Sequence, residues 1–273
     1  MAKRLDLTLV DRGLIDSRSR AKQLVENGCV FVDGKMVKKV SYSCGDDQSV
    51  EIKNDFLKYV SRAGNKLEKA IKVFDVYVKD KIVLDVGCST GGFSDCALQN
   101  GAKRIVAVDV GSDQFSQKLR DDKRIALYEN TDIRSVSDAV VAGAEIAVVD
   151  VSFISVLKII ERISKIDSIR ELVVLIKPQF ECGLAVAKKG KGIVRDGRVY
   201  ADVISNIVVG FEQLGFVICG LDFSPILGGD GNIEFLSYFK RNKENHNKFD
   251  LPSAIKTVIE NAKSFEKETR RCK

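Results

Sequence analysis

Five charged residues lie at or just after the ends of strands that the sequence predicts. They are Asp85, Asp109, Asp132, Asp150 and Lys177. The carboxyl ends of parallel strands meet at one edge of a sheet, and open α/β sheets bind their ligands at that edge. A single charged residue at a strand end is unremarkable, but five together indicate a site that does polar chemistry.

Lys177 is the residue of this group with the most distinctive setting. It closes the apolar run 172–176, which predicts a strand buried on both faces, and it precedes Pro178. Burial lowers the pKa of a lysine, so Lys177 is a candidate general base. Asp150 closes a neighbouring apolar strand. A purely structural ion pair between Asp150 and Lys177 remains the alternative.

A glycine-rich segment follows the predicted strand 82–86. Gly87, Gly91 and Gly92 give the spacing G-x-x-x-G-G, and a helix-compatible segment begins at Phe93. Strand, glycine-rich turn and helix form a common site for nucleotide-like ligands, because glycines let the backbone turn sharply near the ligand. An acid such as Asp109 after the next strand suits ribose hydroxyls. An ordinary turn without a ligand is the alternative.

The elements that position these residues alternate between strand and helix from residue 81 onward. The predicted strands are 82–86, 104–109, 124–128, 145–150, 172–177, 216–223 and 233–239, and the predicted helices are 92–100, 113–120, 134–142, 154–165 and 198–214. This alternation predicts a parallel sheet covered by helices on both faces. The glycine-rich turn between the last two strands predicts an antiparallel hairpin at the edge of the sheet.

A helix over 62–74, capped by Ser61, precedes this sheet. Lys66 lies beside its apolar face, and its spacing alone assigns it no function. Glu234 lies in the last predicted strand, where by itself it is typical of a solvent-facing edge residue. We therefore expect one large domain over 62–240.

Residues 1–53 predict a separate small domain, joined to the large one by a linker over 54–61. Ser17 is a candidate N-cap for a second helix, and Asp33-Gly34 predicts a hairpin. The pattern R-L-D…G-L…S-R-x-x-A…G-x-V-x-V-x-G resembles the S4 domain, a small α+β RNA-binding fold. The resemblance implies that basic residues here contact RNA, namely Arg4, Arg18, Arg20, Lys22 and Lys35. A basic helix on a protein–protein adaptor is the alternative.

Two further basic segments occur near the end of the chain. A glycine-containing stretch after the fifth strand predicts a flexible loop that contacts phosphates through Lys188, Lys189, Lys191 and Arg195. A solvated loop is the alternative. The polar tail 241–273 contains a possible amphipathic helix at 252–269, which we interpret as a terminal helix that docks weakly or frays.

Composition excludes several classes of function. The 273 residues carry 44 basic and 38 acidic side chains, so the net charge of +6 does not by itself indicate nucleic acid. One histidine and seven scattered cysteines argue against a metal site and indicate reduced thiols. We see no secretory signal and no apolar run that could span a bilayer. We therefore expect a cytoplasmic protein without membrane insertion.

The run D-V-G-x-x-x-G-G-F resembles the first motif of S-adenosylmethionine-dependent methyltransferases. The resemblance implies that S-adenosylmethionine is the cofactor and that Asp109 contacts its ribose, with Asp132 near the adenine amine. The rest of the expected cofactor site is the run itself, which comprises Asp85, Gly87, Cys88, Ser89, Thr90, Gly91, Gly92 and Phe93.

Four residues match, in order and by element, the Lys-Asp-Lys-Glu tetrad of the FtsJ-like (RrmJ-type) ribose 2′-O-methyltransferases. They are Lys66, Asp150, Lys177 and Glu234. With the S4-like domain in front, residues 3 to 240 resemble the TlyA family of haemolysin-named rRNA methyltransferases. The expected fold is Rossmann-like, a mostly parallel seven-stranded sheet with an antiparallel edge strand.

This resemblance implies S-adenosylmethionine-dependent 2′-O-methylation of a cytidine ribose in ribosomal RNA, without a metal. Some family members modify both ribosomal subunits and others only the large one. Lys177 would be the general base or would stabilise the alkoxide, while Asp150 would orient it and Glu234 would hold the second lysine or the hydroxyl. The alternatives are a membrane-active haemolysin and an RNA-binding protein with an inactive methyltransferase fold. The intact glycine run and tetrad argue against the latter.

Overall fold

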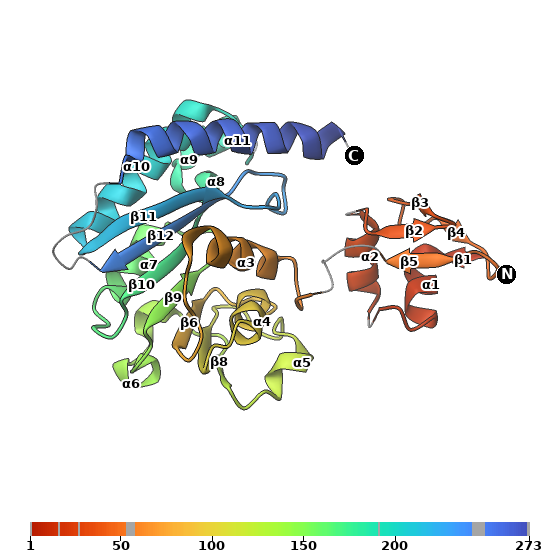
Figure 1. Ribbon diagram of the computed structural model, residues 1–273, viewed down its shortest axis with the longest axis horizontal. Helices are drawn as coiled ribbons and strands as arrows, with labels where there is room; N and C mark the ends of the chain where they lie inside the picture. The colour runs from red at the N-terminus through yellow and green to blue at the C-terminus, as the bar shows by residue number, and fades with distance from the viewer. Residues whose placement is uncertain are drawn as a thin grey trace. The chain divides into compact units, whose positions relative to one another are not determined.

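The computed structural model describes residues 2–15, 17–26, 28–52, 58–190, 192–241 and 249–271. The chain divides into two compact units, Met1–Lys58 and Tyr59–Lys273, which we describe separately (Figure 1). The expected linker over 54–61 runs across this division, and its residues 54–57 lie outside the described ranges.

The described residues of the N-terminal unit form two short helices and five short strands. Its elements are β1 (Lys3–Arg4), α1 (Leu5–Asp11), α2 (Arg18–Glu26), β2 (Val30–Val32), β3 (Lys35–Met36), β4 (Ser43–Cys44) and β5 (Val50–Ile52). Strand β1 pairs with β4, and β2 pairs with both β3 and β5 around a core that includes Leu9 and Val25. Ser17 caps α2 by accepting a hydrogen bond from Arg20 N at 3.3 Å, as its residue type predicts. Strands β1 and β4 were not predicted, because each has only two residues and so shows no periodicity in its sequence.

The larger unit is built on a seven-stranded sheet in the order β11-β12-β10-β9-β6-β7-β8. Strands β10, β9, β6, β7 and β8 run parallel, while β12 is antiparallel to both of its neighbours, β10 and the edge strand β11. The strands are β6 (Ile82–Val86), β7 (Arg104–Val108), β8 (Ile125–Tyr128), β9 (Ile146–Val149), β10 (Glu171–Ile176), β11 (Phe216–Phe223) and β12 (Phe235–Arg241).

Helices cover both faces of this sheet, as Figure 1 shows. One apolar cluster joins the sheet to α7 (Val156–Ile163), α10 (Gly197–Gln213) and α11 (Leu251–Arg271). A second cluster, on the other face, joins it to α3 (Ala63–Phe74), α4 (Gly92–Gln99) and α5 (Gln117–Arg120). The short helices η2 (Ile133–Ser135), α6 (Asp138–Val141), α8 (Pro178–Glu181) and α9 (Leu184–Lys189) lie in the connections.

The structure differs from the sequence prediction in three helical segments. The predicted helix 113–120 shrinks to α5, because Asp113 adopts a positive φ of 58°. The predicted helix 134–142 splits into η2 and α6. The basic segment expected to be a flexible loop from Lys188 onward starts inside α9, so the non-helical part of this segment is shorter than expected.

Helix α11 is part of the core of the larger unit, which corrects our interpretation of a weakly docked tail. Ile255, Val258 and Ala262 are buried in the same cluster as α10. The amphipathic spacing was visible in the sequence, but the surface that receives it was not.

Close packing of the protein backbone requires glycine at two positions of the glycine-rich segment. Gly87 has φ +80°, and a Cβ there would lie 2.7 Å from the carbonyl oxygen of Asp150. A Cβ on Gly92 would lie 2.3 Å from Ser61 Oγ. Gly92 therefore lets α4 approach the start of α3, which is the helix that carries Lys66.

Candidate active site

Four charged residues meet at the carboxyl edge of the parallel strands. Lys66 Nζ lies 2.7 Å from Glu234 Oε2 and 3.3 Å from Asp150 Oδ2, and Lys177 Nζ lies 2.6 Å from Asp150 Oδ1. Lys177 also donates a hydrogen bond to Ser152 Oγ at 2.9 Å. The structure thus joins all four residues of the expected tetrad into one chain of ion pairs.

The sheet topology explains why these residues meet. Asp150 and Lys177 follow the adjacent parallel strands β9 and β10, so both lie at the same edge. Strand β12 runs antiparallel to β10, and its first residue, Phe235, pairs with Ile176 at the end of β10. Strand β12 therefore begins at that same edge. Glu234, just before β12, is therefore only 4% exposed, which corrects the solvent-facing position that the isolated sequence favoured.

Burial and charge act against each other within this tetrad. Burial disfavours the charged form of Lys66, but the carboxylates of Asp150 and Glu234 outweigh it and raise the pKa of Lys66 above its ordinary value. Burial likewise opposes the ionised form of Asp150, yet Lys66 and Lys177 hold its pKa below the ordinary value. The cluster thus pairs two lysines with two carboxyl groups, so each ionisable group of the buried tetrad has a partner of the opposite type.

A cavity of about 400 Å³ opens beside the tetrad, between the ends of β6, β7 and β9. Asp109 and Asp132 supply carboxylates to its wall, and Val110 and Ile133 supply apolar side chains. Cavities of this size and mixed lining are typical of small-molecule sites.

Both of these carboxylates are held by local hydrogen bonds. Asp109 accepts hydrogen bonds from the backbone N–H groups of Ser89 at 2.7 Å and Gly111 at 2.8 Å. Asp132 caps η2 and is paired with Arg134, whose hydrogen bonds lower the pKa of the Asp132 carboxyl. Asp109 therefore fixes the turn after β6 while facing the cavity.

Asp85 lies in a different setting from the one we expected. It is fully buried and accepts a hydrogen bond from Ser94 Oγ at 2.6 Å, while its Oδ1 has no hydrogen-bond partner among the described residues. Burial raises its pKa to about 7. It lines neither the large cavity nor the smaller one beside it, and its hydrogen bond with Ser94 links the end of β6 to α4.

The smaller cavity, of about 160 Å³, adjoins the first one. Both cavities are lined by Gly87, Ser89, Asp150 and Ser152. Lys177 lines the smaller cavity, together with other residues of the glycine run that we had assigned to the cofactor site, Cys88, Thr90 and Phe93. Asp150 therefore stands where the two cavities meet, and Lys177 faces the smaller one.

One aromatic residue at the site escaped sequence analysis. Phe153 lines the larger cavity, is 90% exposed and has a positive φ of 65°, which is a strained conformation for an aromatic residue. Its ring is 4.9 Å from that of Phe180. Its position three residues after Asp150 was the available signal, but the sequence cannot show whether a side chain is exposed.

The basic residues expected to contact RNA lie on both units. Arg4, Arg18, Lys22 and Lys35 are exposed on the N-terminal unit, and Lys188 and Arg195 are exposed on the larger one. Lys191 lies outside the described residues, as does the side chain of Lys189. Asn232 fixes the segment before Arg195, because its side chain accepts a hydrogen bond from Val194 N at 3.0 Å and donates one to Gly192 O at 2.9 Å.

Within the described residues, no cluster of histidine, cysteine and acidic side chains is arranged to hold a metal ion. Of the helices that the structure describes, none has the length and apolar character needed to cross a membrane.

The fold and site define an α/β methyltransferase with a small domain attached. The family described as FtsJ-like methyltransferase matches residues 59–241, and the S4 domain matches residues 3–50. The chain belongs to the FtsJ-like methyltransferase family.

Relatives are similar over nearly the whole chain. YqxC of Bacillus subtilis, named as a candidate rRNA methyltransferase, is 43% identical over 98% of this chain and 96% of its own length. The 16S/23S rRNA (cytidine-2′-O)-methyltransferase TlyA of Mycobacterium tuberculosis is 33% identical over 87% of this chain and 89% of its own length. A solved Streptococcus thermophilus structure, named as a candidate haemolysin, matches with a TM-score of 0.77 and 38% identity over 99% of this chain and 98% of that one.

Proposed function

We propose that this protein transfers a methyl group from S-adenosylmethionine to the 2′-hydroxyl of a ribose, a cytidine of ribosomal RNA. One observation carries the proposal: two adjoining cavities meet at Asp150, and Lys177 faces the smaller one. A methyl donor and a hydroxyl acceptor need such a pair of compartments. The similarity to an rRNA (cytidine-2′-O)-methyltransferase supports the choice of acceptor.

The larger cavity fits S-adenosylmethionine chemically. The carboxylates of Asp109 and Asp132 suit ribose hydroxyls and an amine, while Val110 and Ile133 suit the faces of a purine. When bound, this cofactor supplies an already activated methyl group.

The residues of the tetrad would act on the acceptor hydroxyl. A ribose hydroxyl is a weak nucleophile, which must lose its proton as it attacks. Lys177 would take that proton or stabilise the developing alkoxide, with Asp150 and Ser152 holding its amine at 2.6 and 2.9 Å. Lys66 and Glu234 would keep Asp150 in place, so that the protein contributes mainly alignment.

The cofactor placement predicts that Asp109→Ala weakens S-adenosylmethionine binding by at least about tenfold. The change removes a charged hydrogen-bond acceptor and the contacts that hold Ser89 and Gly111. Isothermal titration calorimetry measures the effect. Asp122→Ala is the matched control, because Asp122 pairs with Arg124 outside both cavities. Equal affinities for wild type and Asp109→Ala would contradict the placement.

Phe153 would stack on the target base as the nucleotide enters the site. Stacking on an aromatic ring contributes about 1–3 kcal/mol per base, so we expect Phe153→Ala to lower kcat/KM for RNA by about 5- to 150-fold. Cofactor affinity should fall by a smaller factor, because Phe153 lines the larger cavity but most of its side chain faces solvent. Tyr77→Ala is the control, since Tyr77 is another exposed aromatic residue, outside both cavities. Loss confined to cofactor affinity would instead make Phe153 part of the cofactor site.

The N-terminal unit would supply RNA affinity, and the ribosomal substrate would place the protein in the cytoplasm. The direct test is to map 2′-O-methylation on ribosomal RNA from cells with and without the gene. We expect a cytidine site whose methylation depends on the wild-type protein and is not restored by the Lys177→Ala variant. Identical methylation maps would overturn the proposed substrate.

A further inference from the structure

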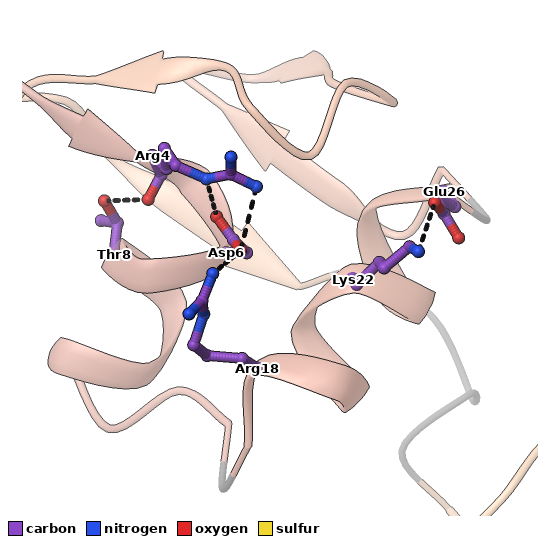
Figure 2. A network of polar contacts seen from close by, with 6 residues as sticks. All are labelled: Arg4, Asp6, Thr8, Arg18, Lys22 and Glu26. Atoms are coloured by element: carbon purple, nitrogen blue, oxygen red, sulfur yellow. Dashed lines mark hydrogen bonds and ion pairs between the residues drawn. The ribbon is translucent and has the colours of Figure 1, made fainter.

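A buried carboxylate in the N-terminal unit lies between two exposed arginines (Figure 2). Asp6 Oδ1 accepts a hydrogen bond from Arg4 Nε at 2.9 Å, and Asp6 Oδ2 accepts one from Arg18 Nη2 at 3.1 Å. The Asp6 side chain is 5% exposed, whereas those of Arg4 and Arg18 are 50% and 62% exposed. The Asp6 carboxylate is therefore buried, whereas the side chains of Arg4 and Arg18 face solvent.

The two guanidinium groups share one oxygen of this carboxylate. Arg4 Nη2 also donates to Asp6 Oδ2, at 3.3 Å, so both Nη2 atoms contact the same atom. Two cations this close repel each other, and a free arginine samples many rotamers. The Asp6 carboxylate offsets the repulsion and fixes both side chains.

The backbone around the arginines is also fixed. Arg4 pairs with Ser43 in the β1–β4 ladder, and its carbonyl oxygen accepts a hydrogen bond from Thr8 Oγ at 3.1 Å. Arg18 begins α2, which packs against α1. Each arginine is thus held at its backbone and, through Asp6, at its guanidinium group. These two anchors fix the distance between the guanidinium groups.

An open groove of about 630 Å³ lies over this arrangement. Arg4, Arg18 and Lys22 line it, along with Asp6, Glu26, Val40 and Ser41. Lys22 and Glu26 form only a loose exposed pair at 3.8 Å. Paired guanidinium forks match the oxygens of a phosphodiester better than single ammonium groups do.

We propose that Asp6 is a positioning residue, which holds Arg4 and Arg18 at the spacing that binds one phosphodiester of RNA. This inference rests on the proposed function of the N-terminal unit. It differs from a simple account of charge, in which an acid next to a phosphate site only weakens binding. Removing the charge of Asp6 should weaken RNA binding if Asp6 positions the arginines, and should strengthen RNA binding if Asp6 only repels phosphate.

The test is RNA binding by the full chain carrying Asp6→Asn. Asparagine keeps the size of the side chain but loses the charge that holds both guanidiniums. We expect affinity for an in vitro transcribed 23S rRNA, measured by filter binding, to fall by about tenfold, although the net positive charge rises by one. Affinity equal to or tighter than that of wild type would overturn the proposal.

Asp11→Asn is the matched control, because it removes one acid from the same helix. Asp11 pairs only with Lys3 in the described network, at 2.6 Å, and both side chains are about half exposed. We expect unchanged or slightly tighter RNA binding for this variant. Melting temperatures of both variants show whether any loss of binding follows from unfolding.

Two further variants separate this inference from the function on which it rests. Arg4→Lys and Arg18→Lys keep the charge but lose the fork, so both should weaken binding at unchanged net charge. If the double variant Arg4→Ala/Arg18→Ala binds as wild type does, the RNA role of this groove is wrong. If that double variant binds weakly while Asp6→Asn and the lysine variants bind normally, only the positioning role of Asp6 is wrong.

Discussion

Lys177→Ala is expected to lower the rate of single-turnover methyl transfer by about a hundred- to ten-thousand-fold, the usual cost of removing a general base. The amine lies at the smaller cavity, 2.6 Å from Asp150, and no other described lysine or histidine lines that cavity. Cofactor affinity should change little, because Lys177 does not line the larger cavity. Rapid-quench assays on preparations with measured melting temperatures test both statements.

Two companion variants sharpen this prediction. Lys177→Arg should also be inactive if proton removal is the role, since a guanidinium stays protonated, whereas partial activity would favour alkoxide stabilisation. Lys81→Ala is the control for a lost ion pair, because Lys81 pairs with Glu171 at 2.6 Å outside the site. If Lys177→Ala is folded and turns over at the wild-type rate, Lys177 has no part in the mechanism.

Lys66→Ala is expected to destabilise the larger unit by about 3–5 kcal/mol, because it leaves the buried carboxylate of Glu234 without its cation. Lys66 contacts both Asp150 and Glu234, whereas Lys177 contacts Asp150 but not Glu234. Removing Lys177 leaves Lys66 bridging both acids, but removing Lys66 leaves Glu234 without an ion-pair partner in the tetrad. Lys66→Ala should therefore melt at a lower temperature than Lys177→Ala.

Urea unfolding of the full chain measures this difference, provided that the transitions of the two units are resolved. The double variant Lys66→Ala/Glu234→Ala is the matched control, since it removes the uncompensated acid together with the lysine. We expect it to recover part of the lost stability but not activity. A Lys66→Ala variant as stable as wild type would contradict the proposed balance of charges.

The sequence by itself determined the order of the elements and the chemistry at their ends. Apolar runs and glycine spacing predicted strands β6 to β10 and the turn at Gly87, because local periodicity reports burial. Asp150 and Lys177 could be placed at one edge, since parallel strands that are neighbours share their carboxyl ends. The Asp33-Gly34 pair likewise predicted the hairpin between β2 and β3.

Only the tertiary structure decided which distant side chains meet and which are buried. Only the family resemblance assigned Glu234 to the tetrad, since its local sequence is typical of a solvent-facing edge residue. It reaches the tetrad because β12 lies antiparallel between β10 and β11. Lys66 meets Asp150, 84 residues later in the sequence, because α3 packs against both α4 and β12. The exposure of Phe153 and the burial of Asp6 depend on packing between segments remote in sequence, for which local residue patterns carry no information.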